Sequence, residues 1–246
     1  MTQDLSSSPS LEIPKRGMPV TIITGFLGSG KTTLLNQILQ NKDNLKVAIL
    51  VNEFGDINID SQLLVSLDED MVELSNGCIC CTINDGLVDA VYRVLEREDA
   101  IDYLVIETTG VADPLPIILT FLNTELRDLT HLDSIITVVD AETFTPTHFD
   151  SQAALSQIVY GDIILLNKTD LVSESKLDRV REEIRKLKKD ARMLQSEYGC
   201  VPLPLILDVE LSNPDLYREI DAEDSHEHHH HHSHHLENDR PISKIP

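Results

Sequence analysis

The chain of 246 residues has few basic residues, few cysteines and no long apolar run. Its 20 lysines and arginines stand against 42 aspartates and glutamates, and the formal charge of -22 opposes binding to nucleic acid or to an anionic membrane. No apolar run approaches the length that spans a bilayer. The polar start, residues 1–14, lacks the features of a signal peptide. We therefore expect a cytoplasmic location and partners other than nucleic acid or membrane.

Short apolar runs alternate with helical patterns between residues 18 and 207. This alternation predicts an α/β fold with a mainly parallel sheet and helices on both of its faces. The organisation we expect is a disordered leader at 1–17, one folded domain at 18–207 and an acidic, His-rich tail at 208–246. The expected strands are 20–24, 46–51, 103–106, 135–139, 163–166 and 203–207, and the expected helices are 31–41, 83–97, 114–123, 150–158 and 174–192.

The most specific motif is the run G-F-L-G-S-G-K-T at 25–32, which fits the phosphate-binding loop pattern G-x-x-x-x-G-K-[ST]. A strand-like run precedes it and a helical pattern follows it, as in a P-loop NTPase. The glycines let backbone N–H groups surround a phosphate, Lys31 can reach the β- and γ-phosphates, and the Thr32 hydroxyl can hold Mg²⁺. The predicted phosphate-binding residues are Gly25, Gly28, Ser29, Gly30, Lys31, Thr32 and Thr33.

A second motif, Asn167-Lys168-Thr169-Asp170, follows the buried-strand pattern at 163–166. The Asp170 carboxylate can accept both the N1–H and the 2-amino protons of guanine, a pair that adenine does not offer. We expect Asn167 and Lys168 to support the base and brace the phosphate loop. Alone, four such residues are usually a turn before a helix, but their place after a strand and downstream of a phosphate loop predicts GTP selection.

Two further segments carry candidate catalytic residues. Glu107 ends a predicted strand, where an acid suits a direct or water-mediated Mg²⁺ contact, and the N–H of Gly110 could sense the γ-phosphate. The polar loop 52–60 occupies the place of a switch segment, and its Asp60 is a candidate to orient the attacking water or to bind Mg²⁺. Many surface loops are acidic without any such role. The predicted catalytic residues are Lys31, Asp60 and Glu107.

Three of the four cysteines stand together in Gly77-Cys78-Ile79-Cys80-Cys81. They are too tightly spaced for two easy disulfides, and in a cytosolic chain such a cluster favours metal ligation over disulfides. Thiolates in this arrangement can bind an ion such as Zn²⁺, with a fourth ligand from elsewhere. A helix predicted to start directly after the cluster would favour the thiolate form. Buried thiols or a redox pair are the alternative interpretation.

The tail contains a histidine tract in which neutral imidazoles could collect Zn²⁺, Co²⁺ or Ni²⁺ with low affinity. Glu227 and Ser233 interrupt it and eleven residues follow it, a pattern that favours a native tract over an engineered tag. The candidate ligands are His226, His228, His229, His230, His231, His232, His234 and His235.

Together the motifs resemble the CobW/YjiA-like metallochaperone GTPases, which belong to the same broad class as the nickel-insertion GTPases of hydrogenase and urease. They occur in the order of that family and cover nearly the whole predicted domain. The matching stretches are G-F-L-G-S-G-K-T-T-L-L-N at 25–36, V-N-E-F-G-D at 51–56, S-N-G-C-I-C-C at 75–81, V-I-E-T-T-G-V-A-D-P at 105–114 and N-K-T-D at 167–170.

The resemblance implies that 18–207 is a P-loop GTPase domain that hydrolyses GTP with Mg²⁺. It also implies that the chain binds Zn²⁺ or Co²⁺ at Cys78, Cys80 and Cys81 and hands the ion to a client metalloprotein. Typical relatives carry a second, C-terminal domain after the His-rich linker, and we expect this domain to be absent here. A homodimer is a candidate assembly. The other functions considered are a non-catalytic metal buffer with a vestigial nucleotide site and a small-molecule P-loop kinase.

Overall fold

The computed structural model describes residues 17–42, 45–52, 71–74, 83–97, 101–209 and 211. All of them belong to one compact unit, Met1–Ser212. The predictions for Asp60, for the three clustered cysteines and for the histidine tract lie outside the described residues. The predicted division into leader, domain and tail stays a prediction.

The described part of the chain forms one seven-stranded sheet in which every pairing is parallel. The strand order is β3-β2-β4-β1-β5-β6-β7, with β1 at the centre. This confirms the predicted α/β class with a parallel sheet. The strands are β1 (Met18–Thr24), β2 (Val47–Asn52), β3 (Met71–Leu74), β4 (Tyr103–Thr108), β5 (Thr130–Asp140), β6 (Ile163–Asn167) and β7 (Arg192–Gln195).

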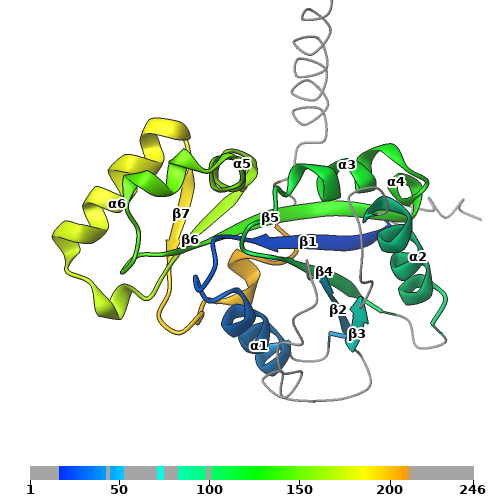
Figure 1. The fold of residues 1–246 in the computed structure, drawn as a ribbon. Helices are drawn as coiled ribbons and strands as arrows, with labels where there is room; N and C mark the ends of the chain where they lie inside the picture. The colour runs from blue at the N-terminus through cyan, green and yellow to red at the C-terminus, as the bar shows by residue number, and fades with distance from the viewer. Residues whose placement is uncertain are drawn as a thin grey trace, which may run out of the picture. The chain divides into compact units, whose positions relative to one another are not determined.

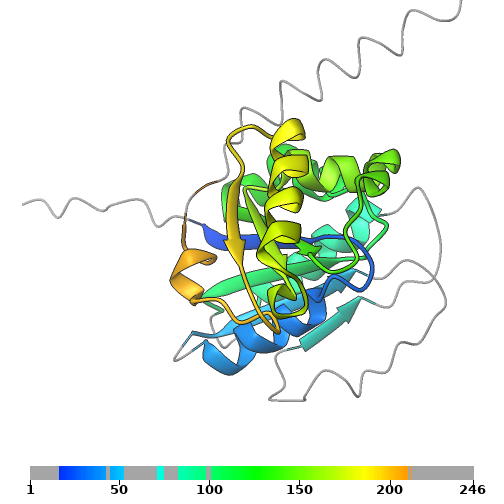
Figure 2. The same ribbon diagram turned by 90° about the vertical axis from the view of Figure 1, so that its left-hand side faces the viewer.

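Helices cover both faces of this sheet, as predicted. Figure 1 shows α1 below the central strands and α3, α4 and α5 above them. Figure 2 turns the molecule so that α6 and β7 face the viewer. The helices are α1 (Lys31–Asn41), α2 (Ile83–Leu95), α3 (Leu115–Asn123), α4 (Leu126–Leu129), α5 (Gln152–Tyr160) and α6 (Glu174–Leu187), with short 3₁₀ turns η1 (Pro146–Asp150), η2 (Thr169–Leu171) and η3 (Leu203–Leu205).

Apolar side chains on the two faces form separate core clusters. On one face, Leu34, Leu35 and Ile38 of α1 are fully buried in a cluster that includes alternate residues of β4, β5 and β6. On the other face, α5 and α6 pack on β6, and α6 contributes Leu177, Val180 and Ile184 at helical spacing. Burial on both faces explains why the central strands read as continuous apolar runs.

One strand prediction was wrong, one helix prediction extended too far, and the strands β3 and β7 were not predicted. Residues 203–207 are not a strand, because Pro204 sits in the first turn of η3 and cannot donate to a sheet ladder. The place at the sheet edge is taken by β7, a short and only partly buried strand with no clear alternation. The helix predicted over 174–192 ends earlier, at Leu187, because the chain after it forms β7. The strand β3 was not predicted, because its four residues show no recognisable strand pattern in the sequence.

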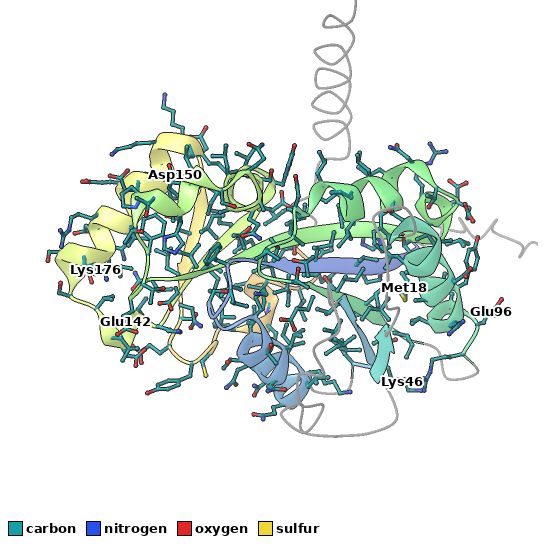
Figure 3. The ribbon with its side chains drawn as sticks, in the orientation of Figure 1. Met18, Lys46, Glu96, Glu142, Asp150 and Lys176 are labelled. Atoms are coloured by element: carbon teal, nitrogen blue, oxygen red, sulfur yellow. The ribbon has the colours of Figure 1, made fainter. Side chains whose placement is uncertain are left out.

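The register of the parallel strands places their carboxyl ends at one edge. Ile23 pairs with Glu107, and Asp140 pairs with Asn167. In Figure 3 the labelled Met18 marks the beginning of β1, and Glu142 lies on the opposite side, just past the end of β5. Ligands of such sheets bind outside the carboxyl ends of the strands, so this edge is where a site is expected. Within the described ranges, none of the helices has the length and apolar character needed to cross a bilayer.

Candidate nucleotide-binding site

The phosphate loop connects β1 to α1 at this edge. Its three glycines, Gly25, Gly28 and Gly30, all have positive φ angles of 133°, 76° and 102°. At Gly30 the requirement for glycine is also steric, because a Cβ there would lie 2.3 Å from Nδ2 of Asn167. The chain can thus take this tight course only with glycine at that position.

Lys31 begins α1 and extends back across its own loop. Its Nζ donates to the carbonyl oxygens of Gly25 at 2.9 Å and Phe26 at 3.2 Å. Burial lowers the pKa of Lys31, while the nearby carboxylate of Glu107 acts in the opposite direction. The structure therefore holds a cationic group inside the loop, at the position that the motif predicts for phosphate contact.

Thr32 and Glu107 come together from separate elements. The Thr32 hydroxyl at the start of α1 donates to Oε1 of Glu107, near the end of β4, at 3.2 Å. A hydroxyl and a carboxylate are hard oxygen ligands of the kind that Mg²⁺ takes from proteins. The donor set therefore fits the predicted Mg²⁺ position, although the roles of both residues stay predictions. Thr33, the next residue of α1, is exposed.

Two buried hydroxyls beside the loop have no hydrogen-bond partner within the described part of the chain. They are Oγ of Ser29 and Oγ1 of Thr109. A buried polar atom without a partner costs about 1–3 kcal/mol, so native proteins rarely keep one without a reason. Both atoms belong to the segments predicted to bind phosphate, and phosphate oxygens are suitable partners for them.

Asn167 joins the phosphate loop to the predicted base-binding loop. Its Nδ2 donates to the carbonyl oxygen of Ser29 at 2.9 Å, and its Oδ1 accepts from Oγ of Ser196 and from the N–H of Gly199, both at 3.0 Å. The side chain is almost fully buried. The predicted bracing of the phosphate loop is thus visible in the contacts, with Asn167 as the brace.

Lys168 and Asp170 occupy the exposed side of the same loop. Lys168 has a left-handed backbone, with φ at 61°, and its Nζ pairs with Oδ2 of Asp140 at 2.7 Å. The carboxylate of Asp170, in η2, is exposed at the surface. Solvent-facing placement leaves this carboxylate accessible to a base, as the guanine prediction requires.

Sequence reasoning missed three residues of this site, Ser196, Gly199 and Asp140. Ser196 and Gly199 follow β7 and hold Asn167, and Thr169 donates from both its N–H and its hydroxyl to the Ser196 carbonyl. Asp140 ends β5 and pairs with Lys168. A polar residue at the end of a buried strand was a usable signal for Asp140. The Ser196 segment offered only an ordinary turn composition.

The backbone at Gly110 lies against the phosphate loop. A Cβ at Gly110 would lie 2.5 Å from the backbone nitrogen of Leu27. The predicted γ-phosphate sensor and the phosphate loop therefore approach each other as closely as glycine allows. Glu107 and Gly110 thus both lie beside the loop that carries Lys31, while their roles toward phosphate stay predictions.

The structure leaves the metal-binding predictions untested. Within the described ranges, His, Cys, Asp and Glu side chains do not gather in groups of three or more that could hold a metal ion. The predicted ligands Cys78, Cys80 and Cys81 and the histidine tract lie outside these ranges. The fourth cysteine, Cys200, is a free thiol at the surface.

Residues 19–195 match the model of the CobW/HypB/UreG nucleotide-binding domain. The chain is 40% identical over 197 residues to the zinc chaperone YjiA of Escherichia coli, covering 76% of this chain and 60% of that protein. It is 38% identical over 232 residues to the zinc-regulated GTPase metalloprotein activator 1 of Dictyostelium discoideum, covering 79% of this chain and 49% of that one. The chain spans between 46% and 64% of the length of five such relatives.

Solved structures agree with this assignment. The crystal structure of Zn(II)-bound YjiA GTPase from Escherichia coli superposes with a TM-score of 0.61 at 32% identity, covering 80% of this chain and 63% of that chain. HypB from Helicobacter pylori, solved in complex with nickel, shares the fold with a TM-score of 0.55 at 19% identity, covering 89% of this chain and 92% of that chain. From its sequence, its fold and the segments that meet at the carboxyl edge of its sheet, this chain belongs to the CobW/HypB/UreG family of nucleotide-binding proteins.

Proposed function

We propose that this chain is the GTP-hydrolysing part of a metallochaperone. It converts GTP to GDP and phosphate, and this reaction is coupled to the binding of a transition metal ion and its transfer to a client metalloprotein. The observation that carries the proposal is the convergence of Lys31, the Thr32–Glu107 pair and Asn167 at one edge of the sheet. Relatives named as zinc chaperones favour Zn²⁺ over Co²⁺ as the metal.

The phosphate chemistry depends on charge placed before the reaction begins. Backbone N–H groups at 28–33 and the ammonium of Lys31 face the β- and γ-phosphates. Lys31 already donates to two carbonyl oxygens of the loop, so its position is fixed before the phosphate arrives. A fixed cation beside developing negative charge lowers the barrier without reorganisation. A bound phosphate also supplies the counter-charge that keeps the buried ammonium protonated.

Thr32 and Glu107 would hold Mg²⁺, which when bound neutralises phosphate charge. The hydroxyl and the carboxylate already contact each other, so little rearrangement is needed to direct both oxygens to one ion. Asp60 is proposed to orient the attacking water or to contribute to the same ion.

Asp170 is proposed to select guanine. Its carboxylate is exposed beside a loop that three hydrogen bonds of Asn167 hold in place. A carboxylate on such a braced loop can accept two hydrogen bonds from guanine, and adenine would leave it unpaired. The nucleotide substrate is therefore GTP.

The transition metal is proposed to bind at Cys78, Cys80 and Cys81, while the histidine tract collects ions with lower affinity. The cysteines follow β3 in the chain and precede α2, and β3 is parallel to its neighbour β2, so it ends at the same edge of the sheet as the nucleotide site. A nucleotide-dependent arrangement of this segment would link the two ligands. Linkage is reciprocal, so a tenfold tightening of metal by GTP, about 1.4 kcal/mol, requires the same tightening of GTP by metal.

The test measures GTP and ATP hydrolysis by the purified chain, with and without Zn²⁺ or Co²⁺, together with metal affinity in the presence of GTP or GDP. The cluster variant replaces Cys78, Cys80 and Cys81 with serine. Its matched control is Cys200→Ser, the same change at a surface thiol. We expect GTP turnover to respond to metal in the parent and in the control but not in the cluster variant.

Two results would contradict the proposal. Tight metal binding without GTP turnover would identify a non-catalytic metal buffer. Equal turnover of ATP and GTP would remove guanine selection by Asp170.

A further inference from the structure

Helix α5 carries two polar side chains that are buried. Ser156 and Gln157 are only 6% and 2% exposed, although apolar residues are the usual choice at such helix positions. A buried hydroxyl or amide without a partner costs about 1–3 kcal/mol. Both side chains find their partners in the segment 110–113, which follows β4 at the nucleotide edge.

The two side chains form hydrogen bonds with three of the four residues of this segment. Nε2 of Gln157 donates to the carbonyl oxygen of Ala112 at 2.9 Å and to that of Gly110 at 3.4 Å. Oγ of Ser156 donates to Oδ2 of Asp113 at 3.1 Å, and Oδ1 of Asp113 accepts from the N–H of Leu115 at the start of α3. Gln157 thus uses both N–H bonds of its amide on the backbone of one short segment.

Gly110 is consequently held from two sides. On one side its Cα lies so close to the phosphate loop that an added Cβ would be 2.5 Å from the nitrogen of Leu27. On the other side its carbonyl oxygen is held by Gln157. Any rotation of the Gly110 backbone must therefore break the Gln157 contact or press against the loop.

The α5 region contacts the phosphate loop at a second point. The ring of His148, in the adjacent η1, lies edge-on against the ring of Phe26, with centroids 4.9 Å apart and planes at 88°. Figure 1 shows α5 beside β5 on the upper face of the sheet, away from α1. The loop and the Gly110 segment therefore share one support, although neither sequence motif includes any residue of α5.

We propose that Gln157 is a positioning residue that orients Gly110 toward the γ-phosphate. The amide holds the carbonyl oxygen of Gly110 and so fixes the Gly110–Val111 peptide plane, while the phosphate loop blocks movement on the other side of the Gly110 Cα. Together the two contacts limit rotation about the φ and ψ angles of Gly110, and so restrict the direction of the Gly110 N–H. The proposal rests on the proposed GTPase function of the same site. It deepens that function by assigning to α5 the distinction between GTP and GDP.

The test is Gln157→Leu, which keeps the approximate shape of the side chain and removes both donors. We expect kcat for GTP to fall about 10²-fold, because a misdirected contact at a reacting group costs that much, with little change in GDP affinity. The affinity ratio of a non-hydrolysable GTP analogue to GDP should fall about tenfold, a change within the usual range of coupling.

The matched control is Thr137→Val. The Thr137 hydroxyl donates to the backbone carbonyl of Gln157, so this variant loses a buried hydrogen bond to the same residue without touching the amide. It should lose stability and keep the analogue-to-GDP ratio. Ser156→Ala, which removes only the contact to Asp113, should lower that ratio about two- to threefold and serves if Gln157→Leu does not fold.

The outcomes separate the positioning role of Gln157 from the proposed GTPase function. If Gln157→Leu weakens the GTP analogue and GDP equally, or if Thr137→Val reproduces its effect, Gln157 is structural and the positioning role is wrong. If Gln157→Leu and Ser156→Ala both keep the ratio, the role is also wrong while the GTPase proposal stands. If the parent chain lacks turnover but the ratio falls in the variants, positioning by Gln157 stands and the GTPase proposal fails.

Discussion

The central strands carry buried polar clusters at both of their ends, and the two clusters differ in kind. The amino-end cluster consists of Thr21, Tyr103, Asp133 and Ser134, all at most 3% exposed. The phosphate-end cluster consists of Lys31, Glu107, Thr109 and Asn167, together with Ser29. The amino-end cluster lies on β1, β4 and β5, and the phosphate-end cluster lies on β4, β6, the start of α1 and the loops after β1 and β4. Burial alone therefore does not separate a site from a structural network.

The polar groups of the amino-end cluster form hydrogen bonds with one another and with the backbone of Asp208. Tyr103 donates to Asp133, and Thr21 contacts both Tyr103 and Ser134 at 2.8 and 3.2 Å. The Tyr103 hydroxyl also accepts from the N–H of Asp208 at 3.2 Å. Burial, together with the hydrogen bond to Asp133, raises the pKa of Tyr103 well above its usual range. This network holds the segment after η3 against the sheet.

The phosphate-end cluster is built differently. It contains a buried ammonium whose donors go to loop carbonyls, and two buried hydroxyls without partners among the described residues. Native interiors seldom keep such atoms. The comparison teaches that buried hydroxyls without a partner among the described residues, rather than buried polarity, distinguish the end where we propose that the nucleotide binds.

The largest expected effect comes from Lys31→Ala. Loss of the buried Lys31 ammonium should reduce GTP turnover about 10³-fold, because it removes a preorganised contact to developing charge. The matched control is Lys186→Ala, which removes an exposed lysine paired with Glu183 on α6. Steady-state kinetics measures both. Near-normal hydrolysis in Lys31→Ala would show that the phosphate-end cluster is as structural as the amino-end one.

The next effect concerns the base. Asp170→Asn should weaken GTP about 100-fold, since the amide no longer accepts both guanine protons, and should favour xanthosine triphosphate, whose 2-oxo group can accept from the new amide. Competition binding with GTP, ATP and xanthosine triphosphate measures the change. Unaltered selectivity would mean that the exposed Asp170 carboxylate does not read the base.

Tyr103→Phe tests the amino-end cluster and should separate stability from activity. The variant keeps the ring but removes the donor to Asp133 and the acceptor for Asp208, which should lower the free energy of unfolding by about 1–3 kcal/mol. GTP affinity and kcat of the folded protein should not change. Urea denaturation and kinetics provide the two readouts, and Tyr198→Phe, at an exposed tyrosine, is the control. A changed kcat would show that the two ends communicate.

Sequence patterns were sufficient to predict strands that are buried on both faces of the sheet and helices whose apolar residues recur at regular spacing. The strand patterns at β1, β4 and β6 and the helix pattern of α1 are confirmed, because continuous apolar runs and helical spacing follow directly from packing. The edge strand β7 has neither signal, and its pairing with β6 outweighs its weak local preference. At 203–207, the apolar residues predicted a strand, but Pro204 lacks the donor that a strand needs.

The candidate site was predictable to the extent that its residues belong to contiguous motifs. Lys31, Glu107 and Asn167 were identified from sequence, and the structure brings them together. Ser196 and Gln157 could not be found in this way, because each contacts a group distant in sequence. The Ser196 hydroxyl donates to the Asn167 side chain, and the Gln157 amide donates to the Ala112 carbonyl oxygen. Such contacts depend on the register of parallel strands and on helix placement, which no local pattern encodes.

The smallest expected effect is the pH dependence contributed by Asp140. Burial alone would raise the pKa of this carboxyl, but hydrogen bonds from Lys168, Thr143 and Glu142 outweigh it, so the pKa lies below its usual value. The unfolded chain, with an aspartate pKa of about 3.9, therefore binds protons more readily than the native state does. The stabilisation is fully present above that value and is lost as the pH falls through the native pKa.

Asp140→Asn should accordingly lower the free energy of unfolding by about 1 kcal/mol at pH 7, with the deficit relative to the parent shrinking below about pH 4. Urea titrations at several pH values measure this difference. The control is Asp128→Asn, which removes an ion pair between Asp128 and Arg127. Their side chains are 78% and 59% exposed, respectively, and ion pairs this exposed contribute little to the free energy of unfolding. Because Asp140 also holds Lys168 beside the predicted base loop, GTP affinity should fall with stability in Asp140→Asn, whereas in Tyr103→Phe it should not. A deficit that stays constant down to pH 3 would show that the Asp140 carboxylate stabilises neither the fold nor the loop through its charge.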